Sequence, residues 1–173
     1  LEGIEDAYEY GIVPFDADND GADEVLVQGT MAYDITSKTL FFKNNSTKLA
    51  TAAHPFKNTF QGIVLPVDVD NDGDLDIFMT NTGTMSKNEK YSYFYINEKG
   101  VFKEKESNIV SYNLAKACFV DIDNDNDKDL IIMGGKIVGD SDDFYTEQTV
   151  DVYTNTNGRF ELFKADAFPF LDS

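Results

Sequence analysis

The chain has 173 residues and a formal net charge of −18 at pH 7, and 42% of its residues are hydrophobic and 13% aromatic. This apolar content suffices for a globular core, whereas so acidic a surface argues against nucleic acid or anionic lipid as a partner. No apolar run approaches the ~20 residues that a membrane-spanning helix needs, so we expect no membrane insertion.

Taken in chain order, an apolar run at 12–15 leads into a highly acidic segment at 16–24, and a second apolar run follows at 25–27. The same succession recurs at 63–79 and at 117–133. The runs after the acidic segments are apolar on both faces, which is typical of strands that are covered on both sides. The acidic segments therefore connect one strand to the next.

Each unit continues with a third apolar segment, an asparagine-centred turn and a fourth segment. The third segments lie at 39–42, 91–96 and 150–153, and the fourth lie around Leu49, at 101–104 and at 159–163. The acidic segments begin at positions 16, 68 and 121, so the unit repeats every 52 or 53 residues. Four strands at this period predict β-propeller blades. Pro14 and Pro66 lie in the first strand, as expected if that strand is an edge.

We name the acidic segments loop 1 (16–24), loop 2 (68–76) and loop 3 (121–129), and number nine places in each. Carboxylates occupy places 1, 3, 5 and 9, and a glycine or asparagine at place 6 fits a turn with positive φ. So many oxygen ligands favour a hard dication, above all Ca²⁺. An EF-hand needs a Glu at place 12 and flanking helices, but Val27, Met79 and Ile132 stand there. EF-hands and dockerins are therefore excluded.

The pattern DxDNDGxxD before an apolar strand, repeated about every fifty residues, resembles the FG-GAP/VCBS-type repeats of bacterial exported β-propellers and of the integrin α-subunit head. The resemblance implies three Ca²⁺ ions, held by side chains at places 1, 3, 5 and 9 and by the backbone carbonyl at place 7. The implied ligands are Asp16, Asp18, Asp20, Ala22, Glu24, Asp68, Asp70, Asp72, Asp74, Asp76, Asp121, Asp123, Asp125, Asp127 and Asp129. Glu24 at place 9, Asn126 at place 6 and the missing FG and GAP motifs depart from the family, so we expect weaker binding in loops 1 and 3.

We expect an all-β fold in which residues 1–173 form a single repeat domain, a propeller-like array of three four-stranded antiparallel blades at about 12–56, 63–112 and 117–170. Propellers close with roughly four to eight blades, so three blades leave the ring open. The chain is then part of a larger β-propeller, or two or more chains complete a ring, or diverged blades are hidden. The short stretches outside the blades leave no room for the last arrangement.

Few other residues offer chemistry. His54 is the single histidine, which leaves little for a His-based metal site or a Ser-His-Asp triad. Cys118 is alone and stands in an apolar run, so we expect a buried core residue and no disulfide. Tyr91, Tyr93 and Tyr95 share one strand face, as a binding strip or as packing against a neighbouring blade. The aspartates within 140–143 form either a solvated loop or another cation or ligand site.

These observations favour a calcium-binding, non-enzymatic binding or adhesion module that recognises a glycan or a protein. We expect no catalytic residues and structural calcium in each blade. Such loops fill best at extracellular calcium concentrations, which predicts an extracellular, cell-surface or periplasmic protein, and the absence of disulfides favours a bacterium. The alternatives are an accessory or catalytic portion of a polysaccharide-degrading enzyme and a spacer that binds calcium alone.

Overall fold

A computed structural model of the protein describes residues 7–31, 37–45, 47–59, 62–81, 92–110, 112–139 and 144–164. These ranges form twelve β-strands and contain no helix. Accordingly, no helix in this part of the chain has the length and apolar character to cross a membrane.

The twelve strands form three sheets of four, and each sheet follows the order of the chain. Sheet 1 contains β1 (Ala7–Phe15), β2 (Glu24–Met31), β3 (Ser37–Asn44) and β4 (Leu49–Ala52). Sheet 2 contains β5 (Val64–Val67), β6 (Asp76–Thr80), β7 (Ser92–Glu98) and β8 (Val101–Lys105). Sheet 3 contains β9 (Tyr112–Val120), β10 (Asp129–Gly139), β11 (Phe144–Thr156) and β12 (Arg159–Lys164). All neighbouring strands are antiparallel, which confirms the predicted array of three four-stranded antiparallel sheets.

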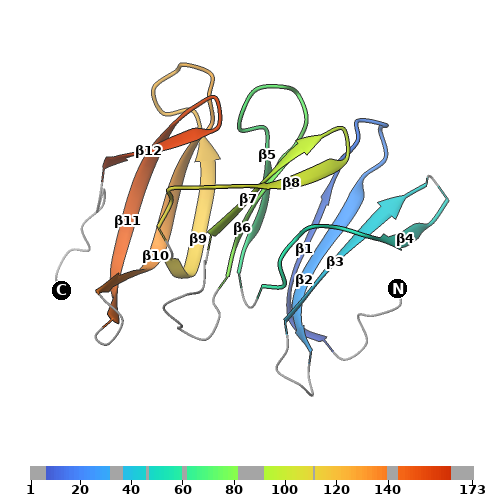
Figure 1. Ribbon diagram of the computed structural model, residues 1–173, viewed down its shortest axis with the longest axis horizontal. Helices are drawn as coiled ribbons and strands as arrows, with labels where there is room; N and C mark the ends of the chain where they lie inside the picture. Colours follow the sequence, from blue (N-terminus) through green and yellow to red (C-terminus); the bar gives the residue numbers. More distant parts are fainter. Residues whose placement is uncertain are drawn as a thin grey trace.

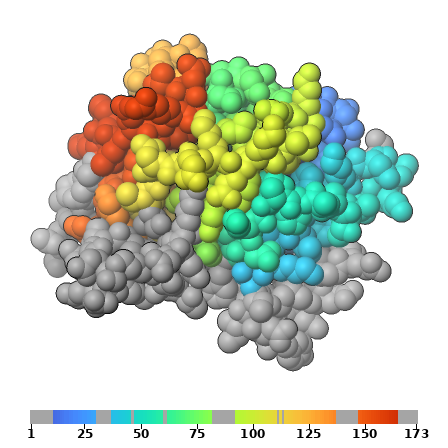
Figure 2. Space-filling view, viewed as in Figure 1, coloured from blue at the N-terminus to red at the C-terminus, as the bar shows by residue number. Residues whose placement is uncertain are grey.

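The sheets stand side by side in chain order (Figure 1), and the three acidic loops all lie at one end of the array, at the top of the view. Figure 2 shows the loops as neighbouring parts of the same upper edge. The arrangement follows from the repeat, because every loop makes the same connection, from the first strand of its sheet to the second.

Sheet 2 packs against a neighbouring sheet on both faces, which explains the unbroken apolar run in β6. On β6, Ile77 and Met79 belong to a core shared with sheet 1, whereas Phe78 between them belongs to a core shared with sheet 3. Successive side chains of a strand point to opposite faces. An apolar residue at every position is therefore required in a sheet that has a neighbour on either side.

The core between sheets 1 and 2 is rich in aromatic rings. Phe56 lies at its centre and contacts Tyr95 and Phe102 with ring centroids 5.0 Å apart in both pairs. Tyr93 and Tyr95 are buried there, 9% and 0% exposed, and the Tyr95 hydroxyl accepts a hydrogen bond from the N–H of Lys57 at 2.9 Å. The alternating tyrosines thus pack against the neighbouring sheet; Tyr91 lies outside the described residues.

The core between sheets 2 and 3 repeats this construction. Phe94 of β7 stacks on Phe160 of β12 at 5.0 Å, and Phe119 of β9 meets Phe78 edge to face at 5.7 Å. Aromatic pairs of this kind add about 0.5–1.5 kcal/mol beyond the area that they bury. The two cores together bind the three sheets into one array.

Two features of the strand edges follow from this arrangement. Pro14 and Pro66 lie in β1 and β5, which are edge strands of their sheets, as predicted. Cys118 is exposed, so the prediction of a buried core residue is wrong. The reason is its face: Cys118 stands opposite Ile131 on the side of sheet 3 turned away from sheet 2, whereas its neighbours Ala117 and Phe119 pack into the core.

His54 has a packing role. Its ring is half-buried and stacks on Phe56 at 5.5 Å, and burial lowers the pKa of its imidazole below the ordinary 6.5. The aspartates at 140, 142 and 143 lie outside the described residues.

Candidate metal centres

The backbone of the three loops follows one template. Place 6 has a positive φ in every copy, as predicted, with values of 87° at Gly21, 92° at Gly73 and 77° at Asn126. Place 4 is an asparagine in every copy and shares this property, with values of 59° at Asn19, 60° at Asn71 and 63° at Asn124. Asparagine tolerates the left-handed region better than most side chains. These two residues with positive φ, at places 4 and 6, fold the backbone of each loop around its own carboxylates.

The hydrogen bonds of loop 1 show how this backbone conformation is stabilised. The two oxygens of Asp16, at place 1, accept the N–H groups of Asp20 at 3.1 Å and Gly21 at 2.9 Å. The carboxylate of Asp20, at place 5, accepts the N–H of Ala22 at 2.8 Å. The bonds from place 6 to place 1 and from place 7 to place 5 recur in loops 2 and 3. The place-5 aspartates therefore cap place 7 within their own loop.

The place-9 carboxylates are buried and connect each loop to the third strand of its own sheet. Asp76 is 0% exposed; one of its oxygens accepts the N–H of Val69 at 3.0 Å and the other accepts the N–H of Asn97 at 2.8 Å. The equivalent pairs of bonds are made by Glu24 with Ala17 and Asn44, and by Asp129 with Ile122 and Asn155. Glu24 thus fulfils the same structural role as the aspartates.

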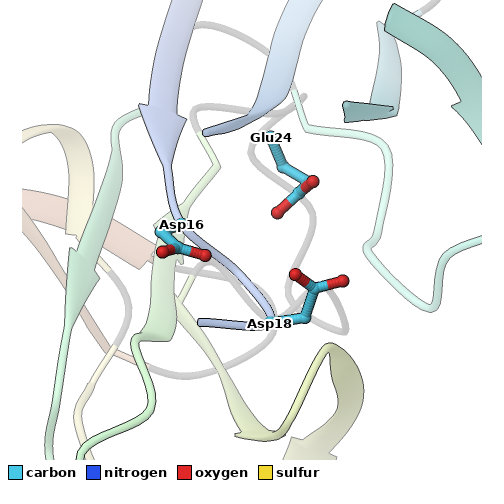
Figure 3. Close-up of side chains that lie close together, drawn as sticks. All are labelled: Asp16, Asp18 and Glu24. Carbon is cyan, nitrogen blue, oxygen red and sulfur yellow. The ribbon is translucent and has the colours of Figure 1, made fainter. Parts of the chain in front are cut away.

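The carboxylates at places 1, 3 and 9 converge in each loop. Figure 3 shows those of Asp16, Asp18 and Glu24 turned toward a common space. In every loop one oxygen from each of the three residues lies within 4.8 Å of the others. The three triads are Asp16, Asp18 and Glu24; Asp68, Asp70 and Asp76; and Asp121, Asp123 and Asp129.

Two of these triads contain carboxylate oxygens that are buried without a hydrogen-bond partner: Oδ1 of Asp18, Oδ1 of Asp68 and Oδ1 of Asp70. An unsatisfied buried anionic oxygen is costly. A hard dication that takes six to eight oxygen ligands would satisfy all of them. The residues present therefore fit a calcium ion.

The electrostatics of loop 2 lead to the same conclusion. Burial raises the pKa of Asp76 to about 6, although hydrogen bonds from Asn97 and Val69 oppose the shift. Burial also raises the pKa of Asp70, and the negative charges of Asp72 and Asp68 raise it further. Carboxylates that resist ionisation in the metal-free loop are those whose charge a bound cation stabilises.

The side chains at place 7 do not join the triads. The carboxylate of Asp74 faces sheet 1 and its own turn, accepting the side-chain amide of Asn19 at 2.6 Å and the N–H of Lys99 at 2.8 Å. Asp127 likewise accepts hydrogen bonds from Asn71 and Asn157. The resemblance assigns the backbone carbonyl at place 7 to the metal, which leaves these side chains available to connect sheets.

A second set of connections runs from the turn of one sheet to the loop of the sheet before. The amide of Asn97 donates to the carbonyl of Ala17 in loop 1 at 2.7 Å, and also to that of Leu75 in the loop of its own sheet at 3.0 Å. The amide of Asn155 donates to the carbonyl of Val69 at 2.8 Å. Sequence reasoning recognised these asparagines as turn residues and missed this role. Their recurrence at the same point of each unit was the available signal.

Among the residues that the structure describes, one buried carboxylate lies outside the loops. Asp151 accepts hydrogen bonds from the hydroxyls of Tyr112 at 2.5 Å and Thr149 at 2.7 Å and pairs with Lys136 at 2.9 Å. Burial raises the pKa of Tyr112, and its bond to Asp151 raises it further, so the phenol stays protonated. Because side chains of sheet 3 surround both oxygens of Asp151, this cluster fits a structural role.

Residues 68–132 match the family model of the FG-GAP-like repeat. The match begins at place 1 of loop 2 and ends in β10 behind loop 3, and so covers one full repeat with both loops. This segment is therefore an FG-GAP-like repeat, as the resemblance predicted. No curated protein and no solved structure gives a match.

Proposed function

We propose that the chain is a calcium-stabilised, non-enzymatic binding module of an exported protein, with one structural Ca²⁺ in each loop. The observation that carries this proposal is the threefold recurrence of a converging carboxylate triad, with unpartnered buried oxygens in loops 1 and 2. Calcium suits these loops better than magnesium, because Mg²⁺ demands near-ideal octahedral geometry and gives up its water reluctantly.

The ion acts on the fold rather than on a reaction. All its ligands come from a single loop, and the place-9 ligand also holds the third strand, so binding ties three strands of a sheet together. The unfolded chain has no preformed site, so the binding free energy adds to folding stability by mass action. A catalytic metal would need a position left open for substrate.

We place the ligand, a glycan or a protein, at the seams between sheets. A cavity of about 600 Å³ lies between β8 and the β11–β12 turn, and it is lined by Phe94, Lys105 and Arg159 among other residues. A smaller one of about 260 Å³ lies at the equivalent seam between sheets 1 and 2, beside Lys43 and His54. The aromatic rings that line both pockets suit a sugar ring or an apolar side chain, and Lys105 and Glu106 add charges of both signs to the larger one.

The calcium part of the proposal is tested by differential scanning calorimetry of the calcium-depleted protein with added Ca²⁺, with added Mg²⁺ and with excess chelator. We expect Ca²⁺ to raise the melting temperature well above the other two conditions, and the double variant D18N/D70N to lose most of this gain. An identical melting temperature in all three conditions would contradict a structural role for calcium.

The binding part is tested by screening the intact protein on a glycan array that includes acidic sugars, with the products analysed for cleavage. Binding without turnover that weakens in Arg159→Ala supports the module and its seam. Turnover would identify an enzyme instead, and the absence of binding to glycans and to protein extracts would leave a calcium-dependent spacer.

A further inference from the structure

We infer that the outer face of sheet 3 is a docking surface for a further four-stranded blade, one that carries an acidic residue at place 7 of its own loop and an Asn-x-x-Gly turn after its third strand. The inference rests on equivalent positions in the three sheets and does not depend on the proposed ligand. It specifies the chemistry of the partner as well as the surface.

Two apolar residues at the start of loop 3, one just before it and one at place 2, are exposed, whereas their equivalents in loops 1 and 2 are buried. The residue just before the loop is 4% exposed at Phe15, 6% at Val67 and 40% at Val120. The residue at place 2 is 1% exposed at Ala17, 1% at Val69 and 39% at Ile122. The triad residue at place 3 is half-buried at Asp18 and Asp70 and exposed at Asp123. In loops 1 and 2 the next sheet covers these positions.

The exposed surface continues along β9 and β10. Cys118 is exposed on this face, and Met133 on the next strand is 43% exposed. Their equivalents in sheet 2 are Leu65 and Thr80, on the face that packs against sheet 3. Val150 on β11 is buried and is therefore not part of this exposed surface, which lies on β9 and β10. The uncovered part therefore has the apolar character and the position of a sheet–sheet interface that the chain builds twice.

Among the described residues, the asparagine at place 4 of loop 3 also lacks the hydrogen-bond partner that its equivalents have in the next loop. Asn19 donates to the place-7 carboxylate of the next loop, Asp74, and Asn71 donates to Asp127. Asn124 occupies the same place with the same positive φ, 63°. Its side-chain amide has no hydrogen-bond partner within the described ranges. A carboxylate at place 7 of an incoming loop would provide one.

The turn of the incoming blade must contain glycine at its fourth position. Gly100 has a φ of +82°, and a Cβ there would lie 2.9 Å from the Cβ of Asp18 at place 3 of loop 1. Gly158 has a φ of +77°, and a Cβ there would lie 3.5 Å from the Cβ of Asp70 at place 3 of loop 2. An equivalent glycine would seat the new turn against Asp123.

Sheet 1 of a second copy does not meet these requirements. Place 7 of loop 1 is Ala22, which has no carboxylate to accept the amide of Asn124. In its turn, Thr47 stands where Gly100 and Gly158 stand in the other sheets. A head-to-tail copy would therefore leave the donor unpaired and press a β-branched side chain onto loop 3, which is why we assign the surface to a different blade.

The experiment appends a second copy of residues 62–110, which carries Asp74 and Gly100, after Ser173 of the full chain. Eleven residues then separate Lys164 from the appended Val64, as many as separate Ala52 from Val64 in the chain itself. The appended segment contains no cysteine, so Cys118 remains the single thiol and reports on the surface. Its modification by a disulfide reagent is measured with and without the appended blade, in calcium, together with far-UV circular dichroism.

We expect the appended blade to fold and to slow the modification of Cys118 by at least about tenfold, since protected sites react only through local opening. A matched control that carries D74A and G100A in the appended copy alone should lose much of this protection. An appended blade that stays unfolded, that leaves Cys118 equally reactive, or that protects it equally in the control overturns the inference.

The same modification of Cys118, measured on the chain without the appended blade, tests whether a second copy or a segment of the same chain covers this surface. Protection of Cys118 that rises with protein concentration, with a dimer in sedimentation, would assign the surface to a second copy. Protection that is independent of concentration would assign it to a segment of the same chain. Either result overturns the proposed blade.

Discussion

Asn97 and Ala17 are separated by 80 positions in the chain and are joined by a hydrogen bond of 2.7 Å between the asparagine amide and the alanine carbonyl. The bond connects the third strand of sheet 2 to the acidic loop of sheet 1. Asn155 and Val69 repeat it between sheets 3 and 2. Loops 1 and 2 are thus held both by their own sheets, through place 9, and by the sheet that follows.

Replacing Asn97 with Ala should lower the free energy of unfolding by about 2–3 kcal/mol, at roughly 1 kcal/mol for each hydrogen bond lost. The side chain bonds to Ala17, Leu75 and Gly100, and it is 0% exposed. Urea denaturation measures the change. Asn45→Ala is the control, because Asn45 is exposed and bonds only within its own turn. An equal loss in both variants would contradict a special role for Asn97.

Gly100→Ala should weaken the proposed calcium site of loop 1, although residue 100 belongs to sheet 2. The new Cβ would press on the Cβ of Asp18 at 2.9 Å, and the φ of +82° adds about 1–2 kcal/mol of backbone strain. Gly73→Ala is the matched control, with a φ of +92° and nothing within 4 Å of its Cβ. Calcium titration calorimetry should show a weakened loop 1 site in the first variant alone; an unchanged site would show that the turn does not support loop 1.

Calcium-depleted protein should become more stable as the pH falls from about 7 toward 5. Burial raises the pKa of Asp76 to about 6 from an ordinary 3.8, so between these values the folded state holds a proton that the unfolded chain has released. This contribution is complete below 3.8 and is lost as the pH rises through about 6. The pKa of Asp70 shifts in the same direction.

Calcium should reverse this trend, because protons and the ion compete for the same carboxylates. Melting temperatures across the pH range, with and without calcium, provide the measurement. Asp76→Asn should reduce the acid stabilisation of the depleted protein. A melting temperature that rises with pH in the absence of calcium would contradict the assignment.

Asp70→Asn should lower the calcium affinity of its loop at least about tenfold, and Asp123→Asn should have a smaller effect on loop 3. Asp70 contributes a buried oxygen that has no hydrogen-bond partner, whereas Asp123 is exposed. Isothermal titration calorimetry of the two variants against the parent protein decides the order. A larger effect at Asp123 would show that cover by the neighbouring sheet does not matter.

Much of the fold follows from local patterns in the sequence. The fixed period, the paired apolar runs and the prolines at 14 and 66 predict the strands, their order in each sheet and the edge position of β1 and β5. The place-6 reversals at Gly21, Gly73 and Asn126 were predictable because few residues tolerate positive φ. These features depend on contacts within one repeat, and the repeat is visible in the chain.

What could not be predicted depends on contacts between repeats. In the sequence, Asp74 cannot be distinguished from the other carboxylates of its acidic loop, yet its side chain accepts a hydrogen bond from Asn19 of the neighbouring loop. Cys118 stands in an apolar run like that of Ile63 to Val67, but only the face that turns toward another sheet is buried, and sheet 3 has no following sheet among the described residues. No local pattern distinguishes the last sheet of an array from a middle one.

All three loops lie at one end of the array (Figure 1), so their carboxylates give the molecule an electric polarity that the proposed calcium ions would reduce. Without the ion, nine triad carboxylates concentrate negative potential at that end, and near an anionic surface the resulting torque turns it away. Each dication bound in a loop would cancel two charges at that end and so would weaken the torque. A change in calcium concentration would therefore alter how the molecule orients beside a charged neighbour.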